Sequence, residues 1–194
     1  KYFLSILVEM EDTELKKFEH TDKQVGIDIG VKNFVITSDG EVFKNNHFLK
    51  KEEKKLKRLQ RQLSNKKKGS NNSEKQRVKI AKLFEKMTNK KETYIHYVVN
   101  KLLTSYDSIF IEDLNVQGML QNHNLAKAIR DVGFYRFKQV LTNKALVNDK
   151  QVISVDRFYP SSKTCSVCGY KKEDLTLNDR EWTCPNCGTK HDRD

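Results

Sequence analysis

The chain has 194 residues, with 37 Lys or Arg against 26 Asp or Glu, so its formal net charge is +11 and its isoelectric point is about 9.4. This length allows one sizeable core and a small additional module, and the basic charge favours a polyanionic partner. No apolar run approaches the length of a membrane span, and the closely paired cysteines fit a reducing, intracellular setting better than a disulfide-rich secreted protein.

The first part of the chain is predicted to form strands. Residues 1–9 alternate in the manner of a strand, and residues 10–23 read as a polar linker. An apolar strand over 24–30 and a hairpin over 34–43, which turns at Asp39-Gly40, together predict three antiparallel strands. Because the chain begins in mid-strand without Met and stops after a charged cluster, we expect it to be a fragment of a longer protein.

The excess of positive over negative charge comes from the next segment. Residues 50–91 contain seventeen Lys or Arg and four Glu, and apolar residues at helical spacing predict one helix over 48–63 and a second from about Ser73 to Leu102. The two helices would form a hairpin with a narrow apolar seam. A solvated outer face would explain some of these lysines, but their density favours contact with a phosphate backbone. The candidate contacts are Lys54, Lys55, Lys57, Arg58, Arg61, Lys66, Lys67 and Lys68.

Three more elements follow the hairpin. Residues 106–113 form an apolar strand that ends in two acids, residues 125–144 form a helix, and residues 151–155 form a further strand. The last two strands should run parallel because a helix connects them. The order of three strands, helix, strand, helix and strand is that of a ribonuclease H-like α/β domain, so we expect a mixed sheet.

Two acids lie in apolar strands. Asp28 stands between two isoleucines, and Glu112 ends the strand after the hairpin, where a carboxylate is costly unless it has a partner. If these strands are neighbours, the two carboxylates converge at one edge of the sheet, while Asp113 points to the opposite face. Either Asp192 or Asp194 could supply a third acid. Three such carboxylates suit two Mg²⁺ ions for phosphodiester hydrolysis, although salt bridges to the abundant lysines are the ordinary alternative.

The four cysteines form two Cys-x-x-Cys-Gly pairs separated by fifteen residues. Each pair bends the chain so that two thiolates point at one metal, and two pairs complete the tetrahedral shell of a structural zinc. The glycine after each pair tolerates the positive φ that such a turn needs. Two disulfides or a thioredoxin-type redox pair are the alternatives. The expected zinc ligands are Cys165, Cys168, Cys184 and Cys187.

Several motifs together resemble one family. They are GIDIGVKN at 26–33, IEDL at 111–114, FYPSSKTCSVCG at 158–169, CPNCGT at 184–189 and HDRD at 191–194. In combination they closely resemble the RuvC-like nuclease domain of the transposon-encoded TnpB proteins, which are related to the compact type V CRISPR effectors. The resemblance covers nearly all of residues 25–194, and the combination is far more specific than any one motif.

The resemblance implies an RNA-guided DNA endonuclease with one RuvC-like site that depends on Mg²⁺ or Mn²⁺. Asp28, Glu112 and Asp194 would be its catalytic acids and metal ligands, with Asp192 as the alternative to Asp194. The partners would be guide RNA and target DNA, with the basic hairpin lining the channel for the guide-target duplex. A membrane and a small-molecule substrate are not expected. The family's usual Asn-Ala-Ala after the third acid is not present in this sequence.

The resemblance also implies a domain organisation. Residues 1–23 would be the end of a preceding β domain and a linker, and residues 24–160 a RuvC-like core with the hairpin inserted at 49–104. Residues 161–190 would be an inserted zinc ribbon, and residues 191–194 the start of the last, truncated RuvC-like segment. The part of the family that binds the guide RNA scaffold and recognises the motif beside the target would lie outside this chain. A prokaryotic cytoplasm is the expected location.

Two other functions would use the same features. One is a noncatalytic, zinc-containing module that binds nucleic acid, and the other is a DDE-type transposase, which joins strands with three acids on the same fold. The presence of both Asp28 and Glu112 argues against a catalytically dead copy. His191 adjoins the cysteines, but four thiolates already fill a zinc shell. We therefore expect it to lie at the surface or to be hydrogen-bonded near the active site, and not to bind the metal.

Overall fold

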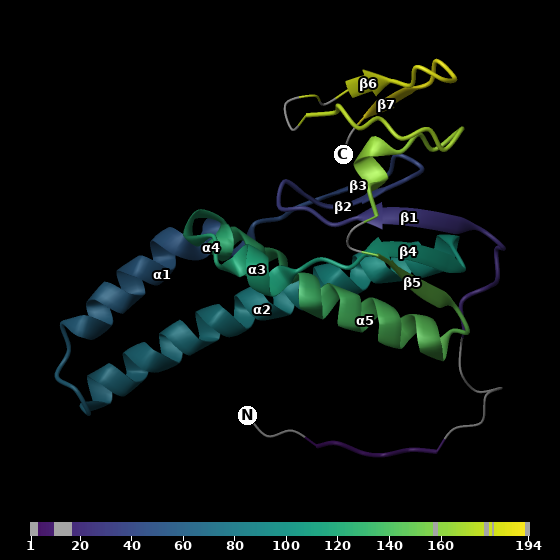
Figure 1. Cartoon of the computed structure of the whole chain (residues 1–194). Coiled ribbons are helices and arrows are strands. Elements are labelled where there is room, and N and C mark those ends of the chain that lie inside the picture. The colour runs from purple at the N-terminus through teal and green to yellow at the C-terminus, as the bar shows by residue number, and fades with distance from the viewer. Residues whose placement is uncertain (1–3, 10–16, 157–158, 177–178, 180, 193–194) are drawn as a thin grey trace.

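The computed structural model describes residues 4–9, 17–156, 159–176, 179 and 181–192, and for residues 123–125, 161 and 192 it describes the backbone alone. A five-stranded sheet lies at the centre. Helices α2 (Asn71–Ser105) and α5 (Phe134–Val147) lie on one side of it, and a module that contains the four cysteines lies beyond it on the other side (Figure 1).

The sheet is mixed, with strand order β3-β2-β1-β4-β5. Strands β1 (Gln24–Asp28), β2 (Asn33–Thr37) and β3 (Val42–Lys44) form an antiparallel meander. Strand β1 also pairs in parallel with β4 (Ser108–Glu112), which pairs in parallel with β5 (Gln151–Val155). A helical connection precedes each parallel pairing, as a parallel pair requires. The α/β class, the mixed sheet and the neighbouring positions of β1 and β4 agree with the expectation from sequence.

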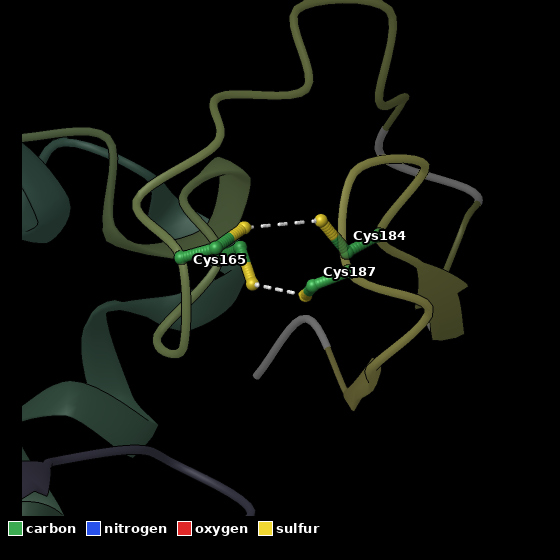
Figure 2. A group of neighbouring side chains, drawn as sticks. Cys165, Cys184 and Cys187 are labelled. Atoms are coloured by element: carbon green, nitrogen blue, oxygen red, sulfur yellow. Dashed lines mark hydrogen bonds between the residues drawn. The ribbon is translucent and has the colours of Figure 1, made fainter.

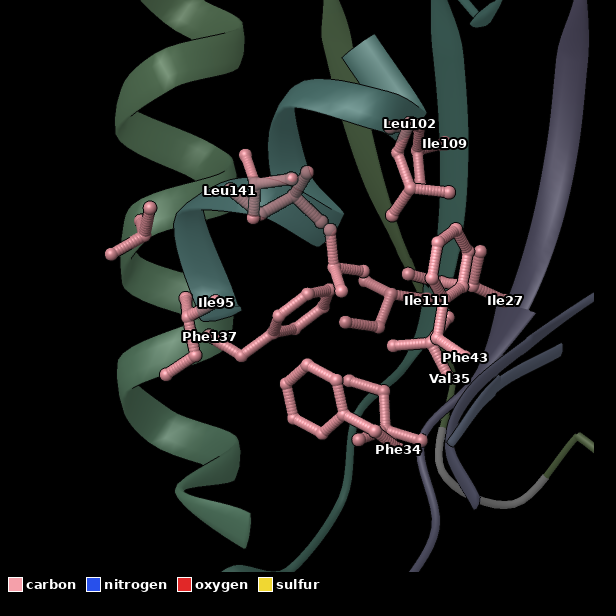
Figure 3. Packing of buried hydrophobic residues seen from close by; sticks show 14 of the residues in the cluster. Ile27, Phe34, Val35, Phe43, Ile95, Leu102, Ile109, Ile111, Phe137 and Leu141 are labelled. Atoms are coloured by element: carbon pink, nitrogen blue, oxygen red, sulfur yellow. The ribbon is translucent and has the colours of Figure 1, made fainter. Parts of the chain in front are cut away.

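The core lies between the sheet and helices α2 and α5. Ile27 and Ile111 point from β1 and β4 toward Leu102 of α2 and toward Phe137 and Leu141 of α5 (Figure 3). Alternate residues of these strands are buried because side chains of a strand point to its two faces in turn. Residues one position away from this apolar set, including the last residues of β1 and β4, therefore belong to the opposite face.

Helices α1 (Phe48–Ser64) and α2 form the basic hairpin, which extends away from the sheet on the side where β1 ends (Figure 1). Leu56 and Leu59 pack against Leu83 and Met87, which is the narrow apolar seam expected from the sequence. The hairpin also contains one buried polar contact, since the side-chain nitrogen of Gln76 donates to the carbonyl oxygen of Leu59 at 3.0 Å. The two helices are thus joined by a thin interface that leaves most of their charged side chains exposed.

Two expectations from the sequence differ from the structure. The single helix expected over 125–144 is two helices, α4 (His123–Val132) and α5, because Gly133 has a φ of 76° that no helix continues through. A short helix, α3 (Val116–Leu120), precedes them. The strand expected over 1–9 is not formed in its described part, residues 4–9, whose exposed apolar side chains have no sheet beside them.

A buried lysine holds the segment before β1 in place. The side chain of Lys150 is fully buried, and its Nζ lies 2.9 Å from Oδ1 of Asp107. The other oxygen of Asp107 accepts hydrogen bonds from the backbone N–H groups of Thr21 and Asp22, each at 2.8 Å. Three carbonyl oxygens accept from Lys150 Nζ: those of Glu19 at 2.9 Å, Leu103 at 2.5 Å and Tyr106 at 3.3 Å. Residues 19–22 are therefore fastened to the ends of the sheet where β4 and β5 begin.

The cysteine module follows β5. It contains a 3₁₀ turn at Ser161–Lys163 and a small antiparallel sheet of β6 (Glu181–Thr183) and β7 (Lys190–Asp192). Its buried cluster consists of Cys165, Leu175, Trp182 and Cys184. Across the described ranges of the chain, no helix combines the length and apolar character that crossing a membrane requires.

Candidate functional site

Asp28 and Glu112 are the last residues of two adjacent parallel strands. The register pairs Ile27 with Ile111, so the next position of each strand is level with the other. Neighbouring strands lie about 4.8 Å apart, and level residues of a parallel pair point to the same face. Since Ile27 and Ile111 face the core, both carboxylates belong to the opposite face at the carboxyl edge of the sheet. Asp28 is half-buried and Glu112 is exposed. The sequence-based expectation that the two acids converge is consistent with this register.

Asp113 turns the other way. It directly follows β4, and its Oδ1 lies 3.4 Å from Nζ of Lys138, which comes from α5 on the core side of the sheet. Its backbone N–H donates to the carbonyl oxygen of Val155 at 3.3 Å. The sequence placed Asp113 on the face opposite to Glu112, and its contact with α5 agrees with that placement.

The third acid lies at the limit of the described chain. Asp194 lies outside the described residues. Asp192 ends β7, where its backbone pairs with Glu181, and its side chain is among those the structure does not describe. The expectation that one of them joins Asp28 and Glu112 therefore stays a prediction.

The four cysteines lie together and could hold one metal ion. The sulfur atoms of Cys165, Cys168, Cys184 and Cys187 all lie within 4.8 Å of one another. Two pairs approach closely, Cys165 and Cys187 at 3.5 Å and Cys168 and Cys184 at 3.6 Å (Figure 2). A tetrahedral zinc with bonds of about 2.3 Å to sulfur needs sulfur atoms about 3.8 Å apart, so the arrangement fits a closed structural site. The distances do not match a disulfide, in which the sulfurs are about 2.05 Å apart.

Hydrogen-bond donors around the thiols tune their protonation. The side chain of Asn186 lowers the pKa of Cys168 to about 6, with help from the backbone of Tyr170. The hydroxyl of Thr189, 3.2 Å from the sulfur, lowers the pKa of Cys187. Burial raises the pKa of Cys184 to about 11. A thiol with a lowered pKa becomes a thiolate readily, and the thiolate is the form that binds metal.

His191 makes a contact that the sequence alone did not identify. Its Nε2 lies 3.1 Å from the sulfur of Cys165, and its ring packs against Trp182 in a tilted arrangement, with the ring centroids 4.7 Å apart. Trp182 and His191 lie side by side because β6 pairs with β7 in a register that sets them opposite each other. The sequence left open a surface position or a hydrogen bond near the active site. The structure shows a hydrogen bond at the cysteine cluster.

The hairpin residues expected to contact phosphate are mostly exposed. Lys66 is half-buried, and the other seven, Lys54, Lys55, Lys57, Arg58, Arg61, Lys67 and Lys68, are exposed. One of them is engaged within the chain, because Glu53 bridges Lys57 at 2.9 Å and Lys127 of α4 at 2.7 Å. Lys127 and Lys57 together lower the pKa of Glu53 to about 2. The charge of Lys57 is therefore partly neutralised by Glu53, so Lys57 is less available to bind a phosphate than a lysine that contacts only solvent.

Comparison with family models gives two matches that together span most of the chain. The family OrfB_IS605, described as "Probable transposase", matches residues 5–123. The Cas12f1-like TNB domain matches residues 134–194, which include the cysteine module.

Individual relatives agree with these matches. A protein from Streptomyces pristinaespiralis is 36% identical over 194 residues, which is 100% of this chain and 47% of the relative. InsQ of Escherichia coli K12 is 33% identical over 199 residues, which is 95% of this chain and 49% of that protein. Both carry the name "Putative RNA-guided DNA endonuclease". The chain thus spans about half the length of these relatives.

A solved structure shares the fold. The protein of a CRISPR-Cas12f ternary complex aligns with a TM-score of 0.55 and 20% identity over 97% of this chain and 39% of that chain. At this identity the match shows similarity of fold alone. The family match over residues 5–123 covers more than half of the sequence, so the chain belongs to the OrfB_IS605 family, and the resemblance to TnpB proteins is confirmed.

Proposed function

We propose that this chain is the nuclease part of an RNA-guided DNA endonuclease with a ribonuclease H-like, RuvC-like fold. The observation that carries the proposal is the level placement of Asp28 and Glu112 at the carboxyl ends of adjacent parallel strands. In a chain of the OrfB_IS605 family, a pair of acids on the face away from the core is suited to phosphodiester hydrolysis. The names of the relatives support the same activity.

Asp28 and Glu112 fit the donor chemistry of a hard divalent cation, because Mg²⁺ and Mn²⁺ prefer carboxylate oxygens. When bound, such ions would polarise a phosphate oxygen and lower the pKa of a bound water. The fold would contribute to the reaction by holding the two carboxylates in fixed positions. The backbone pairing of β1 with β4 fixes the separation of the two acids, and the core beneath them keeps both strands in register.

Asp194 is the third acid in this proposal, with Asp192 as its alternative. The strand β7 ends at Asp192, so the acid would be delivered by the segment that leaves the cysteine module. On this assignment residues 24–160 are the RuvC-like core with the hairpin at 49–104, residues 161–190 are a zinc ribbon, and residues 191–194 begin the last segment of the core. The four cysteines would hold one structural zinc, which fits their spacing and chemistry.

The basic hairpin would bind the backbone of the duplex between guide RNA and target DNA. The hairpin extends from the side of the sheet on which β1 ends (Figure 1), and its lysines and arginines are mostly exposed. A channel wall of this kind reads charge and helical shape, while base pairing with the guide supplies sequence specificity.

The test uses the protein at the full length of its relatives, purified with the RNA that it retains. Cleavage of guide-matched DNA is measured with Mg²⁺ for the original protein and for Glu112→Gln. Abolished cleavage in the variant, with binding of RNA and DNA retained, is the expected result. If neither protein cleaves while both bind RNA and matched DNA, the chain is a noncatalytic binding module. Joining of a free 3′ end to target DNA would instead identify a DDE-type transposase.

A further inference from the structure

His191 stands at the junction of the cysteine module and the segment that would supply the third acid. Its Nε2 lies 3.1 Å from the sulfur of Cys165, a residue that is almost fully buried. Its ring packs at a tilt against Trp182, which belongs to the same buried cluster. His191 is also the central residue of β7, whose last residue is Asp192. The side chain of His191 therefore contacts an expected metal ligand and the apolar centre of the module, and it belongs to the last strand of the module.

The geometry favours a hydrogen-bond donor over a fifth ligand. The group of atoms that fits one ion within the described chain consists of the four cysteine sulfurs and does not include His191. A nitrogen that bound the metal would lie about 2.0–2.1 Å from it and would compete with a thiolate for one of four positions. A nitrogen 3.1 Å from a sulfur is instead placed to donate an N–H to that sulfur.

The other thiols show the same kind of support. Asn186 contacts Cys168, and the hydroxyl of Thr189 lies 3.2 Å from Cys187. His191 makes the same kind of contact with Cys165. Three of the four sulfurs thus each contact a polar side chain, and all three side chains come from residues that follow Cys184. A zinc bound by four thiolates carries a net charge of about −2, and N–H and O–H donors directed at the sulfurs offset that charge without replacing a ligand.

We propose that His191 donates a hydrogen bond from Nε2 to the zinc-bound thiolate of Cys165 and thereby makes zinc occupancy a requirement for holding β7 in place. Strands β6 and β7 have three residues each, and a two-stranded sheet of that size is barely stable alone. Beyond its backbone pairing with β6, β7 is attached to the first cysteine pair by the contact of His191 with Cys165. Loss of the metal would release the strand and the acid that follows it.

The test compares two variants of the full chain, each loaded with Co²⁺ in place of zinc. His191→Phe keeps a ring against Trp182 and removes the N–H donor. His191→Gln removes the ring and keeps an N–H donor of similar reach. The measurements are the cobalt ligand-field bands, the thiolate-to-cobalt charge-transfer band and, for the zinc form, the rate of zinc transfer to a chelator. None of them depends on nuclease activity, so they are independent of the proposed function.

The expected result is specific to the donor. In His191→Phe the ligand-field bands of a tetrahedral four-thiolate site should persist. The charge-transfer band should move to lower energy, because a thiolate without its hydrogen bond gives up an electron more easily. Zinc should be released about 10- to 100-fold faster, the usual effect of losing such a partner on metal affinity. His191→Gln should keep the original charge-transfer energy.

Three outcomes would overturn the proposal. An unchanged charge-transfer band and release rate in His191→Phe would remove the donor role. Faster zinc release from both variants with neither band moved would reduce His191 to a packing residue. A changed ligand field would make His191 a ligand.

A measurement on the unmodified chain guards against misfolded variants. With ¹¹³Cd in the site, the proposal requires a slowly exchanging Nε2 proton coupled to the metal, and a histidine protonated on Nδ1 alone would contradict it.

The strand itself supplies a second readout. Amide hydrogen exchange of residues 190–192 should slow when zinc binds the original chain, and His191→Phe should lose most of that protection. Thr189→Val is the matched control, since it removes a donor to Cys187 and leaves the contact between β7 and Cys165. Equal protection of β7 in the zinc-loaded and metal-free forms of the original chain would show that the metal does not hold the strand.

Discussion

Asp28 and Glu112 occupy equivalent positions on neighbouring parallel strands, each one step beyond the paired residues Ile27 and Ile111. A parallel pair keeps level residues on one face, so the register that buries the two isoleucines places both acids on the opposite face, at the carboxyl edge of the sheet. Asp113 is the next residue after β4, yet it contacts Lys138 on the other side. This difference supplies a matched pair of substitutions.

Asp28→Asn should reduce the rate of DNA cleavage by roughly a thousandfold, because losing a metal-ligand carboxylate removes several kcal/mol of transition-state stabilisation and each ~1.4 kcal/mol is a factor of ten. Binding of guide RNA and target DNA should change little. The control Asp113→Asn removes the same charge from the face that meets α5 and should cleave nearly as fast as the original protein. Equal losses in Asp28→Asn and Asp113→Asn would contradict the assignment of the site.

The hairpin should bind nucleic acid through charges that the chain does not itself neutralise. Replacing Lys54 and Lys55 with Gln should weaken binding of a guide-target duplex and lower the slope of log affinity against log salt by about 2, close to one unit for each phosphate that is no longer neutralised. The control replaces Lys23 and Lys144, which lie outside the hairpin, and should leave the slope nearly unchanged. A slope that falls equally in both variants would mean that the hairpin has no special role.

The sequence predicted the sheet because its signals are local. Val25 and Ile27 alternate with polar or small residues, and a helix between two strands already implies that the strands run parallel. The break at Gly133 was missed because a single glycine within a helical pattern is often tolerated, and only the packing of the helices on each side shows that the chain must turn there.

The sequence could predict the neighbours of a site residue only where it could also predict which strands pair. The expected convergence of Asp28 and Glu112 rests on one assumption, that β1 and β4 are neighbours, and the sheet order agrees with that assumption. The convergence itself stays a prediction. The cysteine cluster needed no assumption beyond its spacing. The contact of His191 with Cys165 depends on the register of β6 and β7, two strands of three residues with no pattern of their own, so no local signal could have predicted it.

Metal removal should unfold the cysteine module, and the chain's single tryptophan reports on it. Trp182 is 5% exposed within the cluster formed with Cys165 and Cys184. A strong chelator should shift its fluorescence emission to longer wavelength, because unfolding exposes the indole to water. Cys184→Ser should show the shifted emission even with zinc present, while the helical signal in circular dichroism is largely retained. An emission spectrum that chelation leaves unchanged would rule out a structural metal.

Lys150→Met should lower the melting temperature by roughly 6–12 °C, since the carbonyl oxygens of Glu19, Leu103 and Tyr106 lose their donor at about 1 kcal/mol or more each and 1 kcal/mol is worth about 2–4 °C at this size. The methionine fills the volume of the lysine stem, so the loss reports the polar contacts. Lys144→Met is the control, because the Lys144 side chain contacts only the exposed Asn100 among the hydrogen bonds described for it. Equal melting of Lys150→Met and the original chain would mean that the carbonyl groups find other donors.

The acid beside Lys150 should make stability depend on pH. The hydrogen bond and charge of Lys150, together with the backbone N–H groups of Asp22 and Thr21, hold the pKa of Asp107 well below its ordinary value of 3.8. Because the folded-state pKa is depressed, the stability that this carboxylate contributes is fully present above about pH 4, the range of the unfolded pKa. It is lost as pH falls from there toward the folded-state pKa.

In urea titrations at about pH 7 and pH 3, the original chain should therefore lose more stability on acidification than Asp107→Asn, whose amide does not titrate. The comparison isolates this one carboxylate from the others that are protonated in the same range. Asp22→Asn removes an exposed acid from the same segment while keeping the backbone N–H that donates to Asp107, and it should follow the original chain closely. If Asp107→Asn and the original chain have the same difference in urea midpoint between the two pH values, the carboxylate is not stabilised by Lys150 in solution.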